Sequence, residues 1–85
     1  MTTPDINLVA AAIDSFVRAY QFAGVTPHEV QVRPSGDDVD VIKVWVDLGE
    51  TKIDRTAWAA SCEAEIGKNV PGAASYRVVV RAESV

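Results

Sequence analysis

Residues 39–48 read VDVIKVWVDL, and this stretch decides the fold. From Val41 onward, aliphatic residues alternate with positions that hold apolar, aromatic or charged residues. Successive side chains of a β-strand point to opposite faces of a sheet. The even positions from 42 to 48 are all aliphatic, which is typical of a face that packs on a core. The odd positions include Lys43 and Trp45, so that face is not a core face. The stretch therefore predicts a long central strand with one buried and one exposed face.

A second alternating stretch, SYRVVVRAE, covers residues 75–83. We expect a strand over 76–83, with Arg77 and Arg81 on one side and mainly apolar residues on the other. A sheet face that combines an indole, valines and guanidinium groups is more suited to contact with a partner molecule than to exposure to water. The candidate interface residues are Val41, Lys43, Trp45, Arg77, Val79 and Arg81.

Helical periodicity precedes these strands. Apolar residues recur at spacings of three and four over residues 6–20, which gives one apolar stripe. Thr3 suits an N-cap and Pro4 the first helical position, while Gly24 can supply the left-handed residue that ends a helix. The pattern predicts a helix over residues 4–22.

Two more elements and a turn complete the order. Residues 28–33 alternate as a short strand, and the turn formers at 34–38 join it to the central strand in an antiparallel hairpin. Residues 54–68 form a second helix with Asp54 as its N-cap. Its apolar stripe consists of Trp58, Cys62 and Ile66.

These elements predict an α+β fold, a two-layer sandwich in α-β-β-α-β order with a three-stranded mixed sheet. Both helices need an apolar surface, so both should pack on one face of the sheet. The crossover through the second helix is long enough for the last two strands to pair in parallel. We expect strand order 1-2-3, with the third strand beside the first as the alternative. The predicted core consists of Val9, Ile13, Phe16, Val17, Tyr20, Ile42, Val44, Val46, Trp58, Cys62, Ile66, Val78 and Val80.

Length and composition restrict the class of protein. The 85 residues make one domain, 1–85, and 48% hydrophobic against 24% charged residues favours a packed core. A net charge of −4 argues against a general nucleic-acid coat, which needs excess Lys and Arg. Cys62 is the single cysteine, which suits a reducing compartment. The sequence shows neither a leader peptide nor a membrane span, so we expect a complete, cytoplasmic protein with no membrane partner.

The sequence shows no motif for catalysis, metal binding or nucleotide binding. His28 is the single histidine, and a lone histidine at a strand start is far more often a solvated side chain than a general base. Cys62 lies in an apolar stripe, and the acidic group Asp37, Asp38 and Asp40 lacks the spacing of a calcium loop. We therefore expect no enzyme, no cofactor and no metal. A small enzyme or ligand carrier is the least favoured class.

The leading expectation is a small non-enzymatic protein-interaction module that is homodimeric. It would use the exposed sheet face and the C-terminal edge strand, whose run of valines is flanked by Arg77 and Arg81. Pairing face to face and pairing edge to edge both remain open. One alternative is a nucleic-acid-binding module that uses Trp45 with Lys43 and the two arginines. Another is an acidic inhibitor of a basic nucleic-acid-handling complex.

Overall fold

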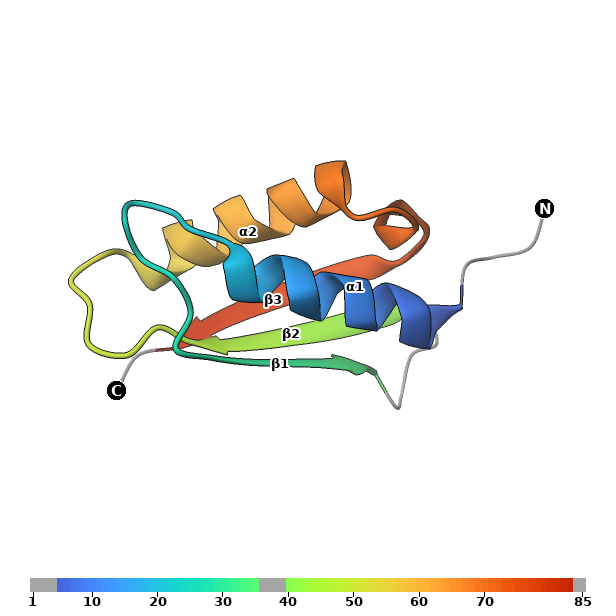
Figure 1. The fold of residues 1–85 in the computed structure, drawn as a ribbon, viewed down its shortest axis with the longest axis horizontal. Coiled ribbons are helices and arrows are strands. Elements are labelled where there is room, and N and C mark those ends of the chain that lie inside the picture. The colour runs from blue at the N-terminus through green and yellow to red at the C-terminus, as the bar shows by residue number, and fades with distance from the viewer. Residues whose placement is uncertain (1–4, 36–39, 84–85) are drawn as a thin grey trace.

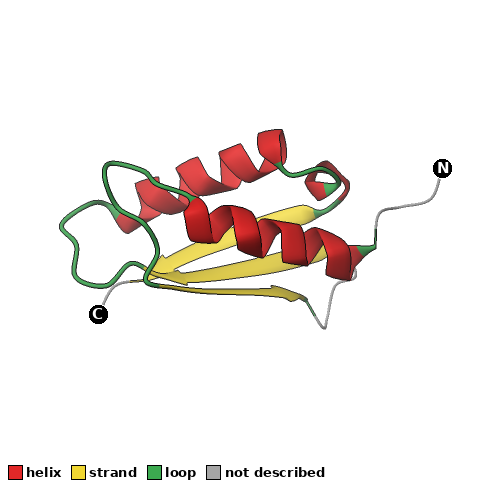
Figure 2. Cartoon of the chain, viewed as in Figure 1, coloured by secondary structure: helices red, strands yellow, loops and turns green. Residues whose placement is uncertain are grey.

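The structure is a computed structural model that describes residues 5–35 and 40–83. Two helices lie on one side of a three-stranded sheet, and Figures 1 and 2 show both helices above the strands. The predicted two-layer α+β sandwich in α-β-β-α-β order is confirmed. The elements are α1 (Ile6–Ala19), β1 (Glu29–Pro34), β2 (Val41–Asp47), α2 (Arg55–Asn69), the 3-10 turn η1 (Ala73–Ser75) and β3 (Arg77–Glu83).

Helix α1 begins two residues later than its sequence pattern predicts. Its N-cap is Asp5, whose carboxylate accepts a hydrogen bond from the Asn7 N–H at 2.8 Å. The prediction of Thr3 as the N-cap of this helix is therefore wrong. Asp5 is an equally good cap residue, and it lies closer to the apolar stripe. Thr3 and Pro4 themselves lie outside the described residues.

The same helix ends at Ala19, three residues before the predicted end. Phe22 and Val25 then exchange both backbone hydrogen bonds across a tight turn. Ala23 and Gly24 hold φ angles of 54° and 80° at the centre of this turn. Gly24 thus serves a two-residue reversal that leads into β1, not the end of the helix.

The sheet has the predicted order β1-β2-β3, with β2 in the centre. β1 and β2 pair antiparallel, and β2 and β3 pair in parallel. β1 lies one residue later than the predicted range of 28–33, because it begins at Glu29 and ends at Pro34. Proline suits an edge strand because it has no N–H to donate.

Helix α2 follows its predicted range of 54–68 closely. The Asp54 carboxylate accepts from the N–H groups of Thr56 and Ala57, which fixes the first turn. The helix continues through Gly67 to Asn69, so the glycine does not interrupt it. The short turn η1 between this helix and β3 carries no signal that periodicity could detect.

The core lies between the helices and the even-numbered face of the sheet. Trp58, Cys62 and Ile66 of α2 are fully buried, as predicted, and Ile42, Val44 and Val46 of β2 lie opposite. Three predicted core residues, Phe16, Tyr20 and Val78, are only partly buried, because they lie at the margins of the two layers. Residues that the prediction omitted complete the core, namely Ala10, Val30, Leu48, Ala59, Val70 and Ala73.

Candidate protein-interaction surface

One face of the sheet has no covering layer. Among the described residues, both helices contact the even-numbered face, and none of the elements lies over the other side (Figure 1). Strand alternation places the odd-numbered side chains on that other side. We call this surface the open face. It consists of Glu29, Gln31, Arg33, Val41, Lys43, Trp45, Asp47, Arg77, Val79, Arg81 and Glu83.

Trp45 lies at the centre of the open face. It is on the middle strand, and its register partners are Gln31 on β1 and Arg81 on β3. Lys43, two residues earlier, lies beside Val79 in the same way. The six candidate interface residues from the sequence therefore share one contiguous surface.

Two shallow hollows flank the side chains of Trp45 and Lys43. The hollow toward β3 has a volume of about 350 Å³ and is lined also by Val79 and Arg81. The hollow toward β1 measures about 280 Å³ and is lined also by Gln31, Arg33 and Pro34. Trp45 is partly buried, whereas Val79 is 40% exposed. The β3 side thus offers apolar surface beside the indole ring.

Charges on the open face separate by sign along the strands. Glu29 pairs in register with Asp47, and Asp47 pairs with Glu83, so one row across all three strands is acidic. Arg33 pairs with Lys43 toward the other end. The acidic row and Arg33 were not among the sequence candidates. The alternation of residues 28–33 was the signal that could have placed Glu29 and Arg33 on this face.

Two local contacts hold part of the acidic row. The Asp47 carboxylate accepts from the Gly49 N–H at 2.8 Å, in the turn that leaves β2. The Glu83 carboxylate pairs with Arg81 Nε at 3.2 Å. Both contacts orient carboxylates without removing them from the surface.

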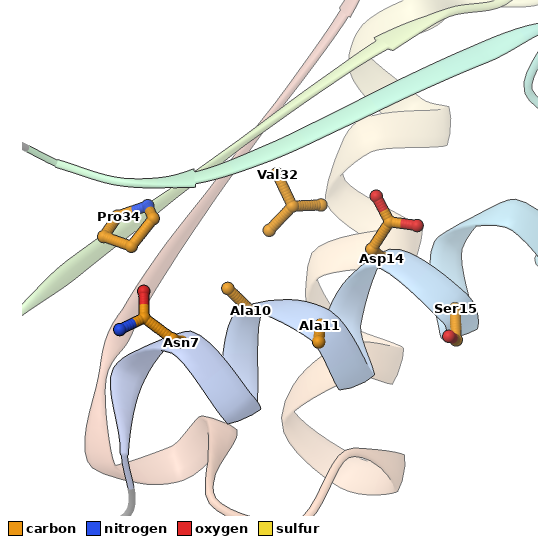
Figure 3. Close-up of a pocket in the computed structure, with 7 residues that line it drawn as sticks. All are labelled: Asn7, Ala10, Ala11, Asp14, Ser15, Val32 and Pro34. Carbon is orange, nitrogen blue, oxygen red and sulfur yellow. The ribbon is translucent and has the colours of Figure 1, made fainter.

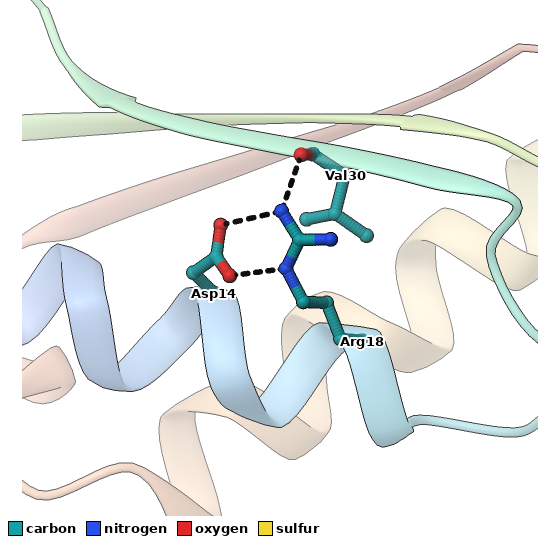
Figure 4. A network of polar contacts seen from close by, with 3 residues as sticks. All are labelled: Asp14, Arg18 and Val30. Atoms are coloured by element: carbon teal, nitrogen blue, oxygen red, sulfur yellow. Dashed lines mark hydrogen bonds and ion pairs between the residues drawn. The ribbon is translucent and has the colours of Figure 1, made fainter.

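The outer edge of β1 is capped by a charged side chain. Ser35 N–H donates to the Val41 carbonyl, and alternation along an antiparallel ladder then directs the backbone groups of Val30 outward. The Val30 carbonyl accepts from Arg18 Nη2 of α1 at 3.2 Å (Figure 4). Asp14 holds this guanidinium from one helical turn earlier, and its hydrogen bond and charge raise the pKa of Arg18.

The outer edge of β3 carries a cap of opposite charge. Arg77 N–H donates to the Asp40 carbonyl beside β2, so Val78 and Val80 direct their backbone groups outward. The Val80 N–H donates to a Glu63 carboxylate oxygen of α2 at 3.4 Å. Each edge of the sheet therefore has a backbone group bonded to an acidic or basic side chain of a helix.

A further groove lies between α1 and β1. It has a volume of about 500 Å³, and its walls are mainly small or short side chains such as Ala10, Ala11 and Val32 (Figure 3). Asp14 contributes a carboxylate that already binds Arg18. The groove offers no pair of groups suited to acid–base chemistry.

The sequence candidates for chemistry lie apart from one another. Cys62 is fully buried, and burial, followed by the nearby Glu63 charge, raises the pKa of its thiol to about 12. His28 is exposed and lies just before β1. No three His, Cys, Asp or Glu side chains among residues 5–35 and 40–83 are placed to hold a metal ion. Asp37 and Asp38 lie outside the described residues.

In the described part of the chain, neither helix has the length and apolar character needed to cross a membrane. Comparison of the sequence with protein-family models and with curated proteins, and of the fold with solved structures, finds no match.

Proposed function

We propose that this protein is a small non-enzymatic protein-interaction module that self-associates through the open face. The observation that carries the proposal is the position of Trp45. A tryptophan occupies the centre of a sheet face that has no covering layer, between two hollows. Tryptophan is among the residues that contribute most to binding when a partner excludes water from it.

The arrangement around Trp45 resembles the anatomy of an interface. Apolar groups from Trp45 and Val79 lie near the middle, and charged side chains surround them on all three strands. Specific interfaces combine an apolar centre with a polar rim in this way. In the described part of the chain, two large hydrophobic side chains are exposed, Val79 and Leu8 on α1.

The edge contacts favour pairing by the face over pairing by the edge. Strand addition needs free N–H and C=O groups along an edge strand. The Arg18 and Glu63 contacts occupy one such group on each edge, and Pro34 has no N–H to offer. In the proposed module, β3 therefore contributes through the side chains of its odd positions.

Nucleic-acid binding is the second candidate, because Arg33, Lys43 and Arg81 lie close to Trp45. A single strand could stack one base on the indole ring. The acidic row on the same face opposes this function, because a phosphate backbone that crosses the sheet would meet three carboxylates.

Sedimentation equilibrium of the intact chain tests the proposal. We expect a dimer at about 100 µM, a range where weak dimers are still populated. Trp45→Glu should give a folded monomer, because it places a charge in the centre of the interface. Leu8→Glu is the matched control, since Leu8 is 72% exposed on the helical layer and its substitution should leave the dimer intact.

Two results would overturn the proposal. One is a wild type that remains monomeric at about 100 µM. A dimer would escape detection at this concentration only if its dissociation constant were in the millimolar range. The other is submicromolar, salt-sensitive binding of a labelled single-stranded RNA that is lost in Trp45→Glu. That second result would assign the open face to nucleic acid.

A further inference from the structure

Each strand of the open face carries a cation toward one end and an anion at the other. On β1 these are Arg33 and Glu29, and on β2 they are Lys43 and Asp47. On β3, Arg77 lies opposite Val41 at the start of the sheet, and Glu83 lies opposite Asp47 at its end. A second cation of β3, Arg81, lies opposite Trp45 in the middle row. Because the strand register brings like charges into line, the whole face has a basic end and an acidic end.

This order is unfavourable within a single chain. Like charges directly opposite one another on neighbouring strands destabilise a sheet. Arg33 lies opposite Lys43, and Asp47 has Glu29 on one side and Glu83 on the other. The Arg81–Glu83 pair relieves only one member of the acidic row. A partner of reversed polarity would offset the remaining repulsion at both ends.

We propose that the open face binds a second copy of this chain with its strands reversed, about a twofold axis perpendicular to the strands and close to Trp45. This inference rests on the proposed function and names the partner's orientation. Arg33 then faces Glu29 of the second copy, and Lys43 faces its Asp47. Each contact occurs twice, because a twofold interface uses the same surface on both subunits.

The other simple arrangement, with the axis along the strands, brings like charges together. The acidic row of one copy would then lie over the acidic row of the other, and the basic ends would also coincide. Like-charge juxtaposition across an interface is costly and rejects that pairing. Charge polarity therefore selects the reversed orientation.

Shape agrees with the reversed arrangement. Two sheets that pack face to face lie about 10 Å apart at about −30°, so side chains from both layers fill the space between them. Near the axis, each Trp45 lies beside the apolar hollow of the other copy, which Val79 lines. Arg81 is in register with Trp45 and therefore lies near Arg81 of the second copy, and the ion pair of each Arg81 with its own Glu83 at 3.2 Å offsets this like-charge contact. The indole thus serves as the apolar centre, and the charged ends set the orientation.

The orientation predicts that salt regulates assembly. The matched charges lie at the rim, where dissolved ions screen them within about 8 Å at physiological ionic strength. The dimer dissociation constant should rise as sodium chloride is raised from about 50 to 500 mM.

Charge exchange on β1 tests the orientation. Arg33 and Glu29 are exposed, and no described residue forms an ion pair or hydrogen bond with either side chain. R33E alone and E29R alone should each weaken the dimer by about tenfold or more, because each turns two attractions into two repulsions. The double variant R33E/E29R should restore the wild-type dissociation constant. Its net charge equals that of the wild type.

Mixing provides the second arm of the test. Wild type and R33E/E29R, distinguished by mass, should form two homodimers and little heterodimer, because the mixed pair brings Arg against Arg and Glu against Glu. The control is the exchange E65K/K68E on the outer side of α2, where the two residues already pair at 4.0 Å. That variant should dimerise and mix with wild type freely.

The failures of the two proposals are distinguishable. A wild type that does not dimerise at all refutes the proposed function. A wild type that dimerises, with no recovery in R33E/E29R or with free mixing between this variant and wild type, leaves the dimer standing and refutes the reversed orientation.

Discussion

The indole Nε1–H of Trp58 donates a hydrogen bond to the Val25 carbonyl at 3.0 Å. Trp58 is fully buried on α2, and Val25 closes the tight turn between α1 and β1. The bond therefore ties the centre of the second helix to the segment that leads into the first strand. It also satisfies the one polar atom that the largest core side chain buries.

Trp58→Phe should lower the free energy of unfolding by about 1–3 kcal/mol, because it leaves the Val25 carbonyl without its donor and opens a small void. Trp58→Ala should cost about 3–5 kcal/mol, a large part of the stability of a small domain. Urea denaturation followed by circular dichroism measures both losses. A loss for Trp58→Phe well below about 1 kcal/mol would contradict a separate role for the hydrogen bond.

A second contact joins the helices directly. The Tyr20 hydroxyl at the end of α1 and the Ser61 hydroxyl of α2 share a hydrogen bond, and the Tyr20 ring meets Trp58 edge-on at 5.4 Å. Tyr20→Phe keeps the ring contact and removes only the hydroxyl. We expect Tyr20→Phe and Ser61→Ala each to cost about 1 kcal/mol, and the double variant to cost less than their sum. Additive losses in a double-mutant cycle would show that the two hydroxyls do not couple.

Much of this fold could be predicted because the alternation in residues 41–48 permits one arrangement only. A slip of one residue would turn Lys43 and Trp45 into the core, so the pattern fixes which face is buried. The first residue of α1 could not be predicted with the same precision, because Thr3 and Asp5 are both good N-cap residues. The contact of Asp5 with Asn7 decides between them.

The candidate site also has a part that the sequence could predict and a part that it could not. Alternation within each strand places Trp45 and Val79 on one face, so the sequence could identify the surface. The acidic row could not be anticipated, because it requires the register among Glu29, Asp47 and Glu83, which lie far apart in the chain. The edge contacts of Arg18 and Glu63 depend on how the helices pack, and local patterns carry no information about that packing.

Cys62 should make stability depend on alkaline pH. Burial raises the pKa of its thiol from 9.0 to about 12, so the folded protein resists losing this proton. The stabilisation is complete below pH 9 and is lost as pH rises toward 12, because the unfolded chain ionises its thiol first. At pH 10 the contribution of this thiol falls by about 1.4 kcal/mol.

Urea denaturation of the wild type and Cys62→Ala at pH 7 and pH 10 measures this effect. The wild type should lose about 1.4 kcal/mol more than the variant between the two pH values. Other groups that titrate in this range act on both proteins alike. An equal pH dependence of the two proteins would show that Cys62 ionises as easily in the folded state as in the unfolded chain.

Removal of the edge caps should expose the sheet to uncontrolled strand pairing. In Arg18→Ala the Val30 carbonyl loses its partner, and in Glu63→Ala the Val80 N–H loses its acceptor. Charged side chains on sheet edges are a common protection against edge-to-edge aggregation. Light scattering during slow heating should therefore detect aggregation at a lower temperature in both variants than in the wild type.

Lys68→Ala is the matched control, because Lys68 is an exposed helix residue whose pair with Glu65, at 4.0 Å, touches neither edge. The double variant Arg18→Ala/Glu63→Ala should aggregate earliest, since both edges then present free backbone groups. Sedimentation velocity below the aggregation temperature should still detect the proposed dimer in all these variants, because the open face is unchanged. A dimer that becomes tighter when the caps are removed would instead place the pairing surface at a strand edge.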